Sequence, residues 1–171
     1  PGALMRIRNA LGLCRDSNTP HTVVVVVGPS GFGKSRYVAE HYPPPDAYYK
    51  SLGTERWWQD YAGQLTVVFD DFTGAVIKFR DLLNLLDRYP QKVELKGGSV
   101  DYLATTTVIT SNRPPHQWYQ PEVVALHGLD ALLRRLTHII EFTAVGVHTR
   151  YETYNQYAEQ HYLEHYPYCN V

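Results

Sequence analysis

A continuous β-branched run, TVVVVV at residues 22–27, leads directly into the glycine-rich segment GPSGFGKS at residues 28–35. A run that is apolar at every position suits a strand buried on both faces, as in a parallel sheet. The glycine-rich segment fits the pattern G-x-x-x-x-G-K-[ST] without a mismatch, and residues 34–41 after it are expected to form a helix. Strand, glycine-rich loop and helix in this order predict a phosphate-binding loop in an α/β protein.

The residue types of this loop suit phosphate for a physical reason. Glycines let the backbone wrap closely, so that successive N–H groups point at phosphate oxygens, and the helix N-terminus adds positive partial charge. Lys34 is expected to reach the β- and γ-phosphates of ATP, and the Ser35 hydroxyl to bind Mg²⁺. The expected nucleotide-binding residues are Gly28, Pro29, Ser30, Gly31, Phe32, Gly33, Lys34 and Ser35.

Polar residues follow two further strands that the sequence predicts. Asp70 and Asp71 end the apolar run at residues 65–69, where an acidic residue is needed to hold Mg²⁺ near the phosphates. We assign Asp70 to the metal and Asp71 to activation of the attacking water, although the two roles can be exchanged. Asn112 follows the buried strand predicted at residues 105–110, and its amide is placed to hydrogen-bond the γ-phosphate or the water.

The remaining periodicity completes an α/β pattern with a mostly parallel central sheet flanked by helices. It predicts helices at 3–14, 79–89 and 131–136, a hairpin at 93–101 that turns at Gly97-Gly98, a strand at 138–142 and a helical tail at 150–166. In that tail Tyr151, Tyr154, Tyr157 and Tyr162 are expected to pack as one stripe. The expected organisation is an N-terminal helix and linker at 1–21, an ATPase domain at 22–145 and a tyrosine-rich tail at 146–171.

Composition excludes several classes of protein. Sixteen Lys and Arg against 17 Asp and Glu give a net charge of -1, so nucleic acid cannot be held by bulk positive charge and must meet a local patch or an assembly. Two cysteines, Cys14 and Cys169, are too few for a disulfide framework and favour a reducing, intracellular compartment. The longest apolar run is too short to span a bilayer, so no membrane partner is expected.

The order of motifs resembles a known family. GPSGFGKS, WW at 57–58, VVFDDF, LLDRYP, VELKGG, TTTVITSN and LLRRL occur in sequence within residues 22–142. Together they resemble the ATPase domain of circovirus-type replication-associated proteins, a superfamily-3 helicase domain within the AAA+ P-loop ATPases. The resemblance implies an ATP-driven, hexameric homo-oligomer that translocates on DNA, including single-stranded DNA, and unwinds it during rolling-circle replication in the host nucleus.

The resemblance also implies roles for individual residues. Asn112 matches the family's sensor, and Lys96 matches the lysine of its DNA-contacting β-hairpin. Arg135, or its neighbour Arg134, matches the arginine finger that completes the ATP site of an adjacent subunit. A lysine beside a Gly-Gly turn is well placed to meet a phosphate backbone.

Some features depart from the family or suggest other functions. No paired histidines or tyrosine nucleophile motif of the family's endonuclease domain is seen, so the chain is expected to be the ATPase domain alone, without nicking activity. The segment from His161 to His165 spells H-x-x-E-H, but we interpret it as a structural histidine pair rather than a zinc site. Two alternatives remain open: a small-molecule kinase with the same phosphate loop, and a nucleotide-gated scaffold.

Overall fold

The computed structural model describes residues 11–53 and 57–164, and this part of the chain is built on a six-stranded sheet with the order β2-β3-β6-β1-β7-β8. All neighbouring strands pair in parallel except the edge strand β8, which runs antiparallel to β7. The expected mostly parallel α/β architecture is therefore confirmed. The elements are β1 (Thr22–Val27), α2 (Lys34–His41), β2 (Ala47–Tyr49), β3 (Thr66–Phe69), α3 (Phe79–Leu85), β4 (Lys92–Leu95), β5 (Gly98–Asp101), β6 (Thr106–Ser111), the 3-10 helix η1 (Pro115–Gln117), α4 (Pro121–His127), α5 (Leu129–Leu133), β7 (His138–Ala144), β8 (Val147–Tyr151) and α6 (Tyr154–Gln160).

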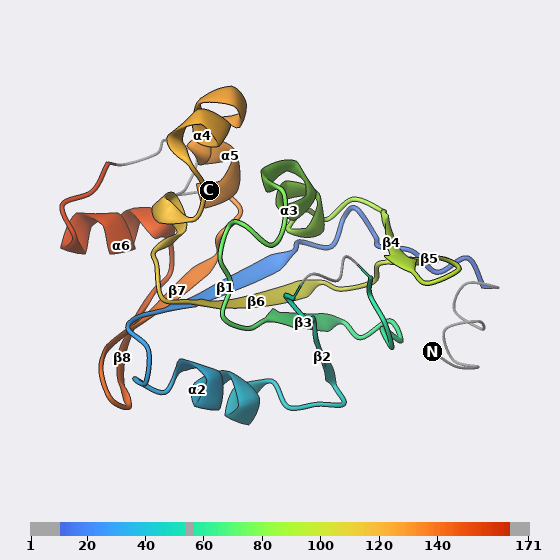
Figure 1. The fold of residues 1–171 in the computed structure, drawn as a ribbon, viewed down its shortest axis with the longest axis horizontal. Helices are drawn as coiled ribbons and strands as arrows, with labels where there is room; N and C mark the ends of the chain where they lie inside the picture. The colour runs from blue at the N-terminus through green and yellow to red at the C-terminus, as the bar shows by residue number, and fades with distance from the viewer. Residues whose placement is uncertain (1–10, 54–56, 165–171) are drawn as a thin grey trace.

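Helices cover both faces of the sheet, with α2 on one face and α3, α4, α5 and α6 on the other (Figure 1). Successive side chains of a strand point to opposite faces, so the valines of β1 divide between two cores. Val24 and Val26 pack in the cluster that contains Val38 of α2. Val23 and Val25 belong to the larger cluster on the opposite face, which contains Leu82 of α3. This division explains why residues 23–27 are all apolar.

The two ends of the sheet carry different features. The carboxyl ends of β1, β3 and β6 lie together because their parallel register places Val27 opposite Ser111 and Phe69 opposite Ile109. The β4–β5 hairpin lies toward the other end, near the start of β6 (Figure 1). Trp58 packs in the aromatic core beside Tyr48 and Tyr102.

The chain departs from the expected elements at several places. β2 was not expected. Residues 1–10 of the expected N-terminal helix lie outside the described residues, and no helix is found at residues 11–14. α3 ends at Leu85 rather than at residue 89, because the carbonyls of Leu85 and Asp87 accept hydrogen bonds from Arg15 instead of continuing the helix.

The tail is also different from the predicted helix. It begins with the strand β8, whose backbone groups pair with β7. The helix α6 begins at Tyr154, and its N-cap is Thr153, whose hydroxyl accepts a hydrogen bond from the Gln156 N–H. Tyr154 and Tyr157 are buried, as the packing stripe requires. Tyr162 is 98% exposed, so its inclusion in the stripe was wrong.

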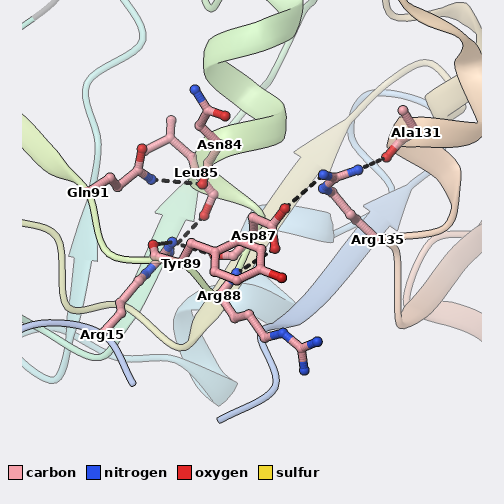
Figure 2. A network of polar contacts seen from close by, with 9 residues as sticks. All are labelled: Arg15, Asn84, Leu85, Asp87, Arg88, Tyr89, Gln91, Ala131 and Arg135. Atoms are coloured by element: carbon pink, nitrogen blue, oxygen red, sulfur yellow. Dashed lines mark hydrogen bonds and ion pairs between the residues drawn. The ribbon is translucent and has the colours of Figure 1, made fainter. Parts of the chain in front are cut away.

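Arg15 joins the segment before β1 to the end of α3 and the start of β6. Its buried guanidinium donates to the carbonyl oxygens of Leu85 (2.8 Å) and Ala104 (2.9 Å) and lies 4.2 Å from the ring centre of Tyr102. Figure 2 shows Arg15 among the residues that follow α3. Arg15 therefore caps the C-terminus of α3 and satisfies carbonyls that the helix leaves without partners.

His21 lies beside this guanidinium. Its Nδ1 is 3.4 Å from Nη2 of Arg15, and its Nε2 is 2.8 Å from the hydroxyl of Thr107. Because arginine only donates, Nδ1 of the neutral ring accepts and Nε2 donates. Burial, together with the Arg15 charge, lowers the pKa of His21 to about 4.

We predict that the free energy of unfolding falls as the pH decreases from about 6.5 to about 4, because unfolded His21 binds a proton that the folded state excludes. Urea midpoints measured near neutral pH and at about pH 5 test this prediction. The His21→Gln variant should lose less stability over the same interval. Equal losses of stability in the wild-type protein and in His21→Gln would contradict the role of His21 in this pH dependence.

Candidate nucleotide-binding site

Glycines allow the loop between β1 and α2 to approach the neighbouring strand β7. Gly28 has φ 148°, and a Cβ at this position would lie 2.6 Å from the carbonyl oxygen of Phe142. Gly33 has φ 102° at the N-cap of α2. Larger residues would be strained at both positions, because L side chains disfavour positive φ. The predicted loop is therefore positioned by both its own glycines and the strand beside it.

Lys34 lies at the centre of the loop and is only 7% exposed. Its ammonium group donates to the carbonyl oxygens of Gly28 (2.7 Å) and Pro29 (2.9 Å) and to Oδ1 of Asn112 (2.8 Å). Burial lowers the pKa of Lys34, while the nearby carboxylates of Asp71 and Asp70 act in the opposite direction. The expected phosphate-binding lysine and the expected sensor are thus in direct contact.

The acidic pair lies next to the loop. The Ser35 hydroxyl donates to Oδ1 of Asp70 at 2.9 Å, and the Thr110 hydroxyl donates to the same oxygen at 2.6 Å. Asp71 has a left-handed backbone with φ 57°, and its Oδ1 is 3.5 Å from the amide nitrogen of Asn112. The start of α2 and the carboxyl ends of β3 and β6 therefore supply one group of polar side chains.

These residues line a hollow of about 490 Å³, to which Gly31, Gly33 and Arg36 also contribute. Carboxylate and hydroxyl oxygens are the ligands that Mg²⁺ prefers, and Mg²⁺ is usually held by one or two carboxylates together with substrate phosphates. The Ser35 and Asp70 oxygens fit this requirement. The Lys34 ammonium and the backbone N–H groups at the start of α2 provide positive charge for phosphate.

The structure thus brings together most of the predicted site residues and leaves three apart. Lys96 is exposed next to the turn of the β4–β5 hairpin, toward the other end of the sheet. Arg134 and Arg135 follow α5 and lie outside the hollow. One chain therefore does not bring its own arginine pair to the phosphate loop.

The two arginines have different surroundings. Arg135 donates to Oδ2 of Asp87 at 2.8 Å and to the carbonyl oxygen of Ala131, as Figure 2 shows. Burial would raise the pKa of Asp87, but hydrogen bonds from the Arg88 backbone and from Arg135 outweigh it, so the pKa is lowered. Arg134 is exposed. Arg135 is therefore held within its own chain, whereas Arg134 faces outward.

Sequence reasoning missed two contributors to these contacts. Thr110 contacts both acidic residues, and Asp87 is the partner of Arg135. The parallel register, which places Ile109 opposite Phe69, was the only signal that could have placed Thr110 next to Asp70.

The histidine motif of the tail was expected to be structural. Nε2 of His161 lies 2.9 Å from Oε2 of Glu141, and His165 falls outside the described residues. Within residues 11–53 and 57–164 no group of three or more His, Cys, Asp or Glu side chains is arranged to hold a metal ion. None of the helices in that part of the chain is long and apolar enough to cross a bilayer.

The chain also resembles known proteins in sequence. A family described as RNA helicase matches residues 24–113. The replication-associated protein of goose circovirus is 45% identical over 124 residues, covering 72% of this chain and 40% of that protein. The replication-associated protein of Porcine circovirus 1 is 45% identical over 124 residues, which cover 72% of this chain and 38% of that protein. The replication-associated protein of Beak and feather disease virus is 44% identical over 117 residues, which cover 68% of this chain and 37% of that protein.

This chain therefore spans about 40% of the length of the curated relatives it matches. The resemblance to circovirus-type replication-associated proteins is confirmed. The phosphate loop, the acidic pair and Asn112 all fall within the matched range. The curated relatives that this chain matches include the replication-associated proteins of circoviruses, and the chain belongs to the RNA helicase family.

Proposed function

We propose that this domain is a Mg²⁺-dependent ATPase that translocates on DNA and unwinds it, as the motor of a viral rolling-circle replication initiator. The observation that carries the proposal is the convergence of Lys34, Ser35, Asp70, Asp71 and Asn112 on one hollow. The similarity to replication-associated proteins supports the replication context. Action in a host nucleus belongs to the same proposal.

Each residue of the hollow has a distinct part in hydrolysis. Lys34 exchanges its contacts with the Gly28 carbonyl and with Asn112 for the β- and γ-phosphates of ATP. Ser35 and Asp70 hold Mg²⁺, which when bound neutralises charge on the phosphates. Asp71 orients the attacking water and accepts its proton, and Asn112 hydrogen-bonds the γ-phosphate or that water.

Contact with DNA requires a local source of positive charge, because the net charge of the chain is -1. We assign this role to Lys96, which is exposed beside the Gly97-Gly98 turn. A homo-oligomeric ring, with six subunits as in the family it resembles, would repeat this lysine around a central DNA strand. A nearly neutral chain would then present a basic pore.

The assembled ring also supplies an arginine to each ATP site. Arg135 is engaged by Asp87 in its own chain, whereas Arg134 is exposed. We therefore assign the trans-acting arginine to Arg134. Such an arginine stabilises charge that develops on the transferred phosphoryl group and raises the rate by roughly 10³- to 10⁵-fold.

We predict that the Lys34→Ala variant neither hydrolyses ATP nor binds it well, because the phosphates lose their only buried cation within the hollow. Asp71→Asn should bind ATP normally and hydrolyse it at least about 100-fold more slowly, since it removes the general base. Phosphate release and binding of a fluorescent ATP analogue measure the two effects. Normal turnover by Asp71→Asn, or transfer of phosphate to a small molecule rather than to water, would contradict the proposal.

Lys96→Ala should weaken binding of single-stranded DNA of any sequence and flatten the salt dependence of that binding. Binding releases counterions from the phosphates that the protein neutralises, so fewer counterions are released when a phosphate contact is lost. Lys92→Ala is the matched control, since Lys92 lies at the base of the same hairpin and pairs with Asp101 at 3.0 Å. Fluorescence anisotropy over a range of salt concentrations measures both. Equal losses in the two variants would remove the specific role of Lys96.

Mixing experiments test the trans-acting arginine. Arg134→Ala and Lys34→Ala should each be inactive alone, whereas mixed rings contain interfaces that join an intact loop to an intact Arg134. ATPase activity should then partly return, most strongly when the two variants are mixed in equal amounts, under conditions in which mass measurements confirm exchange of subunits. Arg135→Ala should lower thermal stability, because it leaves Asp87 without its ion pair. If Arg135→Ala is complemented and Arg134→Ala is not, the assignment is reversed.

A further inference from the structure

The side chain of Thr110 connects the two strands that carry the candidate site. Its hydroxyl donates to Oδ1 of Asp70 at 2.6 Å and accepts from the backbone N–H of Asp71 at 2.7 Å. Thr110 is only 1% exposed. Its position follows from the parallel register: Ile109 lies opposite Phe69, Thr110 is the next residue of β6, and Asp70 directly follows the end of β3.

A hydroxyl has one hydrogen to donate, so these two contacts determine its orientation. Both the Ser35 hydroxyl and the Thr110 hydroxyl donate to Oδ1 of Asp70. These two donors, from different elements, hold the Asp70 carboxylate in one orientation. Its Oδ2 accepts no hydrogen bond from the described part of the chain.

Thr110 also acts on the backbone of the acidic pair. Asp71 has φ 57°, a conformation that few residues other than glycine adopt. Its N–H is bound by the Thr110 hydroxyl, and the following N–H, of Phe72, donates to the Thr110 carbonyl at 2.7 Å. The unusual turn after β3 is therefore held on both sides of Asp71 by a single residue of β6.

We propose that Thr110 is a positioning residue for the hydrolysis assigned to this site, with the hydroxyl setting the geometry of Asp70 for Mg²⁺ and of Asp71 for water. This inference rests on the proposed ATPase function. Thr110, a buried residue of the strand that precedes Asn112, would then hold the metal-binding carboxylate in position without binding the metal itself. Partners that orient metal-binding groups typically change metal affinity or activity by about 10- to 100-fold when removed.

The chain offers a sharp set of variants. Thr110→Val removes the hydroxyl and keeps the shape of the side chain, whereas Thr110→Ser keeps the hydroxyl. Thr107→Val is the matched control: Thr107 lies on the same strand, is fully buried and hydrogen-bonds His21 rather than the acidic pair. Both valine variants lose a buried hydroxyl, but only Thr110→Val loses it at the site. Thr110→Ala serves as a second variant without the hydroxyl.

The experiment measures binding of a fluorescent ADP analogue with Mg²⁺ and with a chelator, and the rate of ATP hydrolysis at saturating ATP. For Thr110→Val, affinity in chelator should be unchanged, because the phosphate loop is intact. The gain in affinity from Mg²⁺ should fall by about tenfold or more, and the turnover rate by about 10- to 100-fold. Thr110→Ser should recover both, and Thr107→Val should show a lower unfolding midpoint with a normal gain from Mg²⁺.

An unchanged gain from Mg²⁺ in Thr110→Val and Thr110→Ala would overturn the inference and leave the proposed ATPase intact. The same is true if Thr107→Val reproduces the loss, or if Thr110→Ser is as impaired as Thr110→Val. A wild-type chain that binds nucleotide without any gain from Mg²⁺ would overturn both the inference and the proposed function.

Discussion

The parallel pairing of β1 with β6 and of β6 with β3 determines where the candidate site forms. The register places Val27 opposite Ser111 and Phe69 opposite Ile109, so the phosphate loop, the acidic pair and the sensor leave the sheet at one edge. A shift by one residue would send the side chains of a strand to the opposite face. The site thus depends on backbone hydrogen bonds deep in the sheet as much as on the polar residues that line it.

The two proposed activities lie toward opposite ends of this sheet. β6 begins near the hairpin that carries Lys96 and ends at the residues that support Mg²⁺ and ATP (Figure 1). The segment between α3 and the hairpin is held by Arg15, through backbone carbonyls, and by Arg135, through the Asp87 side chain (Figure 2). Because these contacts are partly or fully buried, they resist salt and water better than exposed ion pairs do. The Asp87–Arg135 contact therefore links the segment that leads into the hairpin to the end of α5, where Arg134 faces outward.

The sequence predicted the parts of the site that depend on local motifs. The loop at 28–35 and the acidic pair follow apolar strands, and parallel geometry then requires them to meet. Thr110 was missed because a threonine inside a buried strand resembles an ordinary core residue until the register is known. The Asp87–Arg135 pair joins distant parts of the chain, so no periodicity points to it. β8 was missed because four of its five residues are exposed, and the strand exists only by pairing with β7.

A structure determined with Mg²⁺ and a non-hydrolysable ATP analogue tests the central claim most directly. The account predicts that the β- and γ-phosphates lie against the backbone N–H groups that precede Ser35, with Mg²⁺ between the phosphates and the oxygens of Ser35 and Asp70. Lys34 should have moved from the carbonyl of Gly28 to the phosphates. Nucleotide bound elsewhere, for example in the cavity of about 480 Å³ beside Trp58 and α3, or phosphates in the loop with Mg²⁺ remote from Ser35 and Asp70, would contradict it.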